Sequence, residues 1–288
     1  KIKIGYFKYK DSDSFNELAV TSTWNWQMGS MLQWVGPEYD NQIVFNDLRN
    51  GKFISRVISI DSGNESEHEM PIYALSPDGS FALCIDYGRL FWYRRGYNYQ
   101  GVKNNKKKVF FDPNDAIWKL DFKTGEVKKI LTFKEISEIS FKSSMKTGAN
   151  YLEHIMISPS GKDFIFYHRW QLEDGSIHTR ALISDIHGDN LRIINDTGRM
   201  SHVHWRNDDT LIGFGSMPSR LLNLRKNYSF LRKYFFKPLL PIYHKLSSGK
   251  QTLRNTFTGD GYYLFDSNSP EKSEKIVHEH LNENGHPS

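Results

Sequence analysis

The residues that decide the fold run from Asn150 to Trp205, and they read NYLEHIMISPSG (150–161), KDFIFYHRWQ (162–171), TRALISD (179–185), LRIIN (191–195) and SHVHW (201–205). Short apolar runs alternate with turns that contain Pro, Gly and Asp, which is typical of antiparallel strands joined by hairpins. The first four runs make one four-stranded sheet, and the last run begins another. The pattern predicts one blade of an all-β propeller and the start of the next.

The strand directions in this stretch place several polar residues at one end of the blade. If the first strand starts at His154, the second returns to end at His168 and Arg169, and the third leaves again from Arg180. His202 starts the first strand of the following blade, so it is expected at the same end of the blades. Because the innermost strands of a propeller line its central channel, we expect these side chains at one mouth of that channel.

The remaining sequence repeats the same pattern. Strands are predicted at 24–34, 42–47, 53–60, 71–79, 81–86, 116–122 and 126–133, after an arm at 1–22 that could supply an outer strand. His154 and His202 are 48 residues apart, close to the roughly 40 to 45 residues of a four-stranded blade. The sequence predicts four blades and, at His286, the start of a fifth, which makes the chain a C-terminally incomplete single propeller domain over residues 1–288.

Composition bounds the remaining choices. The chain has 288 residues, of which 38% are hydrophobic, and a single cysteine that stands in an apolar run, Cys84. Such a chain can bury a large core, has no intrachain disulfide and contains no apolar run of about 18 residues that would span a membrane. The formal net charge of +5 favours acidic partners without choosing between glycan, nucleic acid and anionic membrane.

Two predicted insertions, at 93–115 and 217–258, leave the ends of second strands and would overhang the same mouth. Apolar residues at helical spacing predict a helix within 217–245. This helix is interpreted as a cover or lid, with peripheral membrane contact through 219–243 as the alternative. Interleaved basic and aromatic residues also suit single-stranded nucleic acid, but no nucleic-acid motif accompanies them, so no such partner is expected.

Four short motifs stand near the predicted first strands of the blades: Asn25-Trp26-Gln27, Leu152-Glu153-His154, Ser201-His202-Val203-His204-Trp205 and Gly285-His286-Pro287. They resemble motifs of the oligogalacturonate lyase family and of related seven-bladed propeller lyases that act on other uronate polysaccharides. The resemblance implies β-elimination at a 4-linked uronate, with His202 as the catalytic base. It also implies a divalent metal, Mn or Ca, bound by His286, and no organic cofactor.

The residues themselves suit this chemistry. Abstraction of a proton next to a carboxylate needs a base with a pKa near neutrality, for which His202 and His154 are the candidates, and a cation such as Arg180 to offset the charge. Side chains repeat every two residues along a strand, so His204 could join His202 in holding a metal. Residues predicted to bind substrate are Trp26, Gln27, Tyr87, Arg89, His168 and Arg169.

Each of these residues also has a structural interpretation, because a histidine at a strand start is as often a turn or core residue as a functional one. The predicted function is therefore a lyase that cleaves an acidic oligosaccharide or polysaccharide. The alternative is a non-catalytic propeller that binds acidic glycan, or a protein partner, in surface polysaccharide biosynthesis. A cytoplasmic location is expected, or a periplasmic one if a signal segment preceding Lys1 has been removed.

Overall fold

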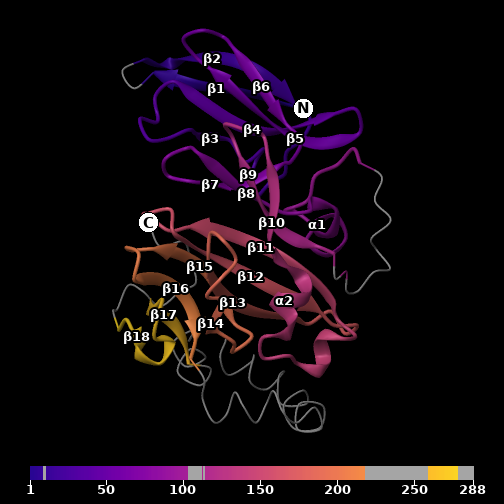
Figure 1. The fold of residues 1–288 in the computed structure, drawn as a ribbon, viewed down its shortest axis with the longest axis vertical. Coiled ribbons are helices and arrows are strands. Elements are labelled where there is room, and N and C mark those ends of the chain that lie inside the picture. The colour runs from indigo at the N-terminus through magenta and orange to yellow at the C-terminus, as the bar shows by residue number, and fades with distance from the viewer. Residues whose placement is uncertain (9–10, 103–111, 113, 218–258, 278–288) are drawn as a thin grey trace, which may run out of the picture. The chain divides into compact units, whose positions relative to one another are not determined.

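Alternating apolar and polar residues form four antiparallel sheets of four strands each, preceded by a hairpin. The computed structural model describes residues 1–8, 11–102, 112, 114–217 and 259–277 (Figure 1). The hairpin pairs β1 (Ile2–Lys8) with β2 (Asp11–Thr21). The first blade contains β3 (Gln33–Trp34), β4 (Gln42–Arg49), β5 (Lys52–Ser59) and β6 (Glu65–His68). The second contains β7 (Ile72–Leu75), β8 (Phe81–Cys84), β9 (Ala116–Asp121) and β10 (Val127–Thr132).

The third blade contains β11 (Ala149–Ile157), β12 (Asp163–Gln171), β13 (Ile177–Asp185) and β14 (Arg192–Asn195). The fourth contains β15 (Met200–Trp205), β16 (Thr210–Ser216), β17 (Asp260–Asp266) and β18 (Glu274–Lys275). In every sheet the strands are hydrogen-bonded in sequence order. The predicted propeller of four-stranded antiparallel blades is confirmed, and its sheets do not close into a ring. The seven-bladed parent stays a prediction.

The chain consists of two compact units, each defined by contacts among its own residues. One comprises Lys1–Ser176 with Ser184–Leu191, and the other comprises Ile177–Ile183 with Arg192–Ser288. The helix predicted within 217–245, the membrane contact through 219–243 and the strand start at His286 lie outside the described residues. In the part of the chain that the structure describes, no helix is long and apolar enough to cross a bilayer.

In the first unit, both faces of blade one are covered. Side chains alternate along β4, so Val44 faces one way and packs with Ile72, Ala82, Cys84 and Leu120 of blade two. Ile43 and Phe45 face the other way and pack with Ile58 and with Ile4 of the hairpin. The β1–β2 hairpin therefore covers the face of blade one that lies opposite blade two. Cys84, predicted as a buried thiol, lies fully inside this core.

The connection between β8 and β9 contains a short helix, α1 (Tyr87–Tyr93), whose N-terminus is capped by the Asp86 side chain. A second helix, α2 (Phe133–Glu138), follows β10 and begins with a capping box between Thr132 and Glu135. A 3₁₀ turn at Ser143–Met145 then leads into β11. α1 was not predicted, because the first insertion was expected to begin only at residue 93.

The first strands of three blades are interrupted at matching points. The pairing register shifts between Ile72 and Ala74 in β7, between Glu153 and Met156 in β11, and between Ser201 and Val203 in β15. Each shift marks a β-bulge, in which an extra residue redirects the strand locally. Tyr73, His154 and His202 occupy these bulges, and both histidines adopt positive φ angles, of 55° and 50°. The bulges decide where these side chains point.

Candidate functional site

A buried carboxylate stands at the centre of the candidate site in the first unit. Glu153 of β11 pairs in register with Tyr167 of β12, and its side chain is fully buried. Nε of Arg169 lies 2.8 Å from one carboxylate oxygen, and Nε of Arg94 donates a hydrogen bond of 3.1 Å to the other. Arg94 follows α1, so this carboxylate connects the β8–β9 insertion with blade three.

The charge state of Glu153 follows from these neighbours. Burial alone raises the pKa of a carboxyl group, but the hydrogen bond from His154 and the charges of Arg169 and Arg94 outweigh it and hold the pKa of Glu153 at about 2. Glu153 is therefore ionised at neutral pH. Removing either guanidinium would leave part of that charge without a partner.

His154 lies beside this cluster and is held from several sides. Its backbone N–H donates a 2.8 Å hydrogen bond to the Tyr73 hydroxyl, and its ring contacts those of Tyr167, at 5.1 Å, and Tyr97, at 5.5 Å. Its Nδ1 atom is 3.5 Å from a Glu153 carboxylate oxygen. Burial lowers the pKa of His154 despite Glu153, so the ring is neutral at neutral pH.

Aromatic, arginine and glutamine side chains, some exposed and some half-buried, adjoin this cluster. The guanidinium of Arg94 lies 4.5 Å from the centre of the Tyr97 ring, a cation–π contact, and Arg95 is exposed. The backbone N–H of Gln27 donates a 3.3 Å hydrogen bond to the carbonyl of Gly96, which joins this loop to the turn before β3. We call the following residues the aromatic–arginine surface: Trp24, Trp26, Gln27, Arg94, Arg95 and Tyr97.

The turn at the front of this surface explains why a tryptophan is exposed there. The Asn25 side chain accepts hydrogen bonds from the N–H groups of Gln27 and Met28, which closes a tight turn with Trp26 near its tip. Trp26 is 84% exposed, and its ring packs edge-on against Trp24 at 5.0 Å. An indole presented to solvent on a braced turn is available to a ligand.

Three residues predicted to bind substrate form hydrogen bonds within the fold. Nε of Arg89 donates a 2.8 Å hydrogen bond to the Asn150 carbonyl, and the His168 ring lies 3.1 Å from the Asn150 side-chain oxygen. Tyr87 donates from its hydroxyl to the carbonyl of Ile72 at 2.9 Å. Arg89, His168 and Tyr87 are all almost completely buried. Of the other predictions, Trp26 and Gln27 are exposed, and Arg169 pairs with Glu153.

The remaining predicted residues lie in the second unit. His202 is partly buried at its bulge, whereas His204 is exposed and its Nδ1 lies 2.8 Å from the Trp205 carbonyl. Arg180 of β13 is fully buried, and that burial lowers its pKa to about 10 although Asp196 acts in the opposite direction. The catalytic roles proposed for His154, His202 and Arg180 stay predictions, because positions alone assign no reaction.

The metal site implied by the lyase resemblance is incomplete in the described residues. They contain no group of three or more His, Cys, Asp or Glu side chains arranged to hold a metal ion. His204 forms its own backbone contact, and His286 lies beyond residue 277. No step of a reaction is therefore assigned to a metal here.

Sequence reasoning missed two residues of the site, Glu153 and Tyr73. Glu153 stands in the otherwise apolar strand sequence YLEHIMI, and a carboxylate inside such a strand needs charged partners. The sequence does offer such a partner, Arg169, which stands two residues after Tyr167 on the neighbouring strand and therefore on the same face as Tyr167. Nothing in the sequence marked Tyr73, whose role depends on the bulges of two neighbouring blades.

The fold defines the class of protein: a β-propeller built from four-stranded antiparallel sheets. No protein-family model matches the sequence, and no curated protein matches it. Among solved structures it is similar to prolyl endopeptidase, with 12% identity over 86% of this chain and 28% of that one, at a TM-score of 0.46. The propeller domain of the trilobed protease from Pyrococcus furiosus has 12% identity over 86% of this chain and 56% of that one, at a TM-score of 0.42. TolB from Acinetobacter baumannii has 14% identity over 74% of this chain and 48% of that one, at a TM-score of 0.39.

The prediction that this protein is a polysaccharide lyase is contradicted by these comparisons. The similar structures include prolyl endopeptidase, acylaminoacyl peptidase and tricorn protease, which are not polysaccharide lyases. The propeller part of the resemblance is confirmed, while the lyase, pectin, uronate and metal-binding parts are not supported. This chain spans between 16% and 56% of the length of the similar chains named above. At such low identity a shared propeller describes architecture and not chemistry.

Proposed function

We propose that this propeller is a non-catalytic binding module that recognises an acidic carbohydrate at the aromatic–arginine surface. The observation that carries the proposal is Trp26, an 84% exposed indole that packs against Trp24, on a turn that is hydrogen-bonded through Gln27 to the loop after Arg94 and Arg95. Isolated apolar side chains on a surface need no explanation, but aromatic rings grouped with arginines are typical of recognition sites.

The chemistry of the surface fits a sugar acid. The flat face of Trp26 offers apolar area for the C–H face of a pyranose ring, while its polar edge tolerates water. Arg95 is exposed and could pair with a carboxylate through two parallel N–H groups. Gln27 adds an amide that can donate to, or accept from, a sugar hydroxyl.

The neighbouring charged cluster supports binding more than turnover. Glu153 is already compensated by two guanidinium groups, and His154 packs against two tyrosine rings. Both side chains brace the loop that carries Arg94 and Tyr97. A braced loop lowers the entropy lost when a ligand binds, which benefits a recognition module.

The test is a calorimetric titration of the protein with galacturonate oligomers, with methyl-esterified oligomers as the uncharged comparison. Binding is expected with the acid and not with the ester. Trp26→Ala should weaken binding at least tenfold, because the stacking face is lost. Phe141→Ala removes another exposed aromatic ring of the same unit and serves as the matched control that leaves binding unchanged.

The contribution of charge is tested separately. Arg95→Gln should weaken binding of the acid and reduce its dependence on salt, because one counter-charge is removed. Equal binding of acid and ester, or equal loss in Trp26→Ala and Phe141→Ala, would contradict the proposal. If the natural chain binds neither the acid nor the ester but does bind a purified protein, the protein-partner alternative is favoured.

A further inference from the structure

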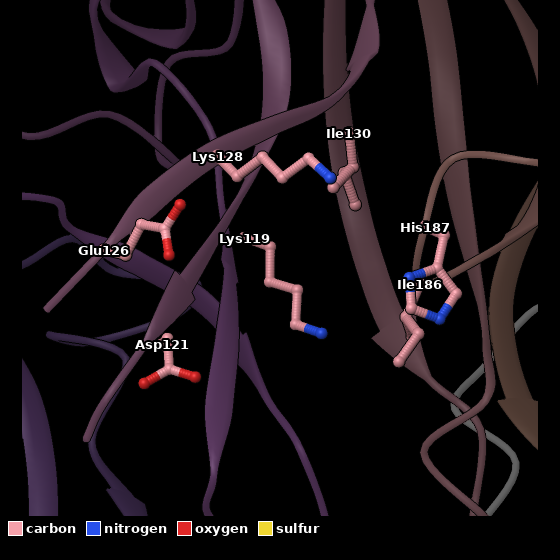
Figure 2. Close-up of a pocket in the computed structure, with 7 residues that line it drawn as sticks. All are labelled: Lys119, Asp121, Glu126, Lys128, Ile130, Ile186 and His187. Atoms are coloured by element: carbon pink, nitrogen blue, oxygen red, sulfur yellow. The ribbon is translucent and has the colours of Figure 1, made fainter. Parts of the chain in front are cut away.

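A second pocket lies away from the aromatic–arginine surface, between the β9–β10 hairpin and the turn after β13 (Figure 2). Its volume is about 170 Å³. Apolar walls come from Ile130 and Ile186, and the basic groups are Lys119, Lys128 and His187. The pocket lies entirely within the first unit. Two acidic residues, Asp121 and Glu126, also line it.

The turn that forms one wall is fixed in place. The side chain of Asp185 accepts hydrogen bonds from the N–H groups of His187 and Asp189, both at 2.9 Å. The backbone N–H of Ile186 donates to the Lys162 carbonyl at 3.0 Å. Gly188 has a φ of 93° and lies so near the backbone of Ile130 that a Cβ atom would be 1.8 Å from its carbonyl oxygen. The wall therefore depends on a glycine at this position.

The two lysines stand directly opposite each other, since Lys119 and Lys128 are register partners in β9 and β10. Like charges placed opposite each other across a pair of strands repel, which makes this arrangement unfavourable unless an anion lies between them. Neither lysine has an ion-pair partner within 4.0 Å in the described residues, although Lys119 also lies over the Phe81 ring at 4.4 Å. The pair is thus poised to take up negative charge.

Neither acidic residue forms an ion pair within 4.0 Å with these lysines in the described residues, although the charge of Lys119 contributes to lowering the pKa of Asp121. One oxygen of Asp121 accepts hydrogen bonds from the N–H groups of Lys123 and Thr124, and from the Thr124 hydroxyl. Hydrogen bonds to Thr124 are the main reason that the pKa of Asp121 lies below its usual range. Figure 2 shows the Asp121 and Glu126 carboxylates on one side of Lys119, while the lysine ammonium groups point toward Ile130, Ile186 and His187.

We propose that this pocket binds the phosphate group of a small phosphorylated molecule. Two ammonium groups act as point charges that suit a tetrahedral dianion, whereas a planar carboxylate is better matched by the fork of an arginine, which the pocket lacks. The His187 ring adds a further hydrogen-bond donor. Ile130 and Ile186 then face the carbon skeleton that carries the phosphate.

The experiment follows the histidine ring resonances of the full chain by NMR while phenyl phosphate, inorganic phosphate or benzoate is added. His187→Gln identifies the His187 resonance. Phenyl phosphate should shift it saturably, inorganic phosphate should shift it more weakly because the apolar walls go unused, and benzoate should have the least effect.

The matched variants are Lys128→Ala and Lys129→Ala, which remove neighbouring lysines from opposite faces of β10. Lys128→Ala should abolish saturable binding, and Lys129→Ala should preserve it. Melting temperatures confirm that both variants fold. Absence of saturation by phenyl phosphate, benzoate binding as tight as phenyl phosphate, or equal loss in the two variants would overturn the proposal. Because Trp26 takes no part, Trp26→Ala should bind phenyl phosphate normally, which separates this site from the carbohydrate surface.

Discussion

A single side chain, Glu153, sets the electrostatics of the first unit. Its carboxylate is fully buried between Arg169 and Arg94. A buried ion pair adds little net stability compared with an apolar replacement, yet removing one partner is costly because the other charge remains. Glu153→Gln should therefore lower the free energy of unfolding by roughly 3 to 5 kcal/mol.

Urea denaturation measures this effect. The matched control is Glu67→Gln, since Glu67 pairs with Arg49 at 3.2 Å on the surface and such exposed pairs contribute about 0 to 1 kcal/mol. An equal cost for the two substitutions would mean that the Glu153 cluster is no stronger than an ordinary surface pair.

The same residue predicts how stability depends on pH. In the fold, the pKa of Glu153 is about 2, below its ordinary value of 4.5. The unfolded chain therefore takes up the proton first, so this stabilisation is complete above pH 4.5 and is lost as the pH falls toward 2. Burial lowers the pKa of His154 below 6.5, so its contribution has the same direction, beginning below pH 6.5.

Measured between pH 7 and pH 2, the unfolding free energy of the natural chain should decline more steeply than that of Glu153→Gln below about pH 4.5. Parallel curves in that range would show that Glu153 titrates normally in the fold.

At the scale of single elements, Arg89 helps to attach α1 to blade three. Nε and an Nη atom of Arg89 both donate to the Asn150 carbonyl, and Asp115 lies 3.5 Å from Nε. Asn150 itself donates from its side chain to the carbonyls of Met145 and Gly148. Arg89 thus ties the β8–β9 insertion to the start of β11.

Arg89→Lys keeps the charge but loses the forked donor, so it should cost roughly 1 to 3 kcal/mol. Amide hydrogen exchange should accelerate in α1, at Arg94 in particular, whose N–H bonds to the Leu90 carbonyl. Arg95→Lys, at an exposed position, is the control that should leave exchange in α1 unchanged. Unaltered exchange in Arg89→Lys would mean that other contacts fix the helix.

At the scale of the whole molecule, the N-terminal hairpin completes the packing of blade one. Ile4 packs with Ile43, Phe45 and Ile58, and the Thr21 hydroxyl donates to the buried Asp47 carboxylate at 2.7 Å. Removal of residues 1–22 would expose this apolar face to water. The truncated protein should melt at a lower temperature, bind the dye ANS and self-associate.

Lys3→Gln breaks only the exposed pair with Glu17, at 2.8 Å, and should change none of these properties. A truncated protein that melts normally and stays monomeric would show that the hairpin is not required for the integrity of blade one.

The sequence predicted the strands well and the side-chain directions poorly. Apolar alternation locates β4, β12 and β13 because each buries one or both of its faces against neighbours. It could not assign His168 and Arg169 to opposite faces with different roles, because that depends on which partner each face meets. Arg89 was predicted to bind substrate since its loop looked exposed, although Asp86 before it was already a helix-capping signal.

The bulges in β7, β11 and β15 give this scaffold interchangeable positions. Each inserts one residue at the same point of its blade, filled here by tyrosine or histidine, and each absorbs the distortion within a few residues. Replacing the residue at one bulge changes the side chain presented there while the flanking strand residues keep their pairing. Such a chain can diversify its recognition blade by blade through point substitutions alone, and a protein engineer can do the same.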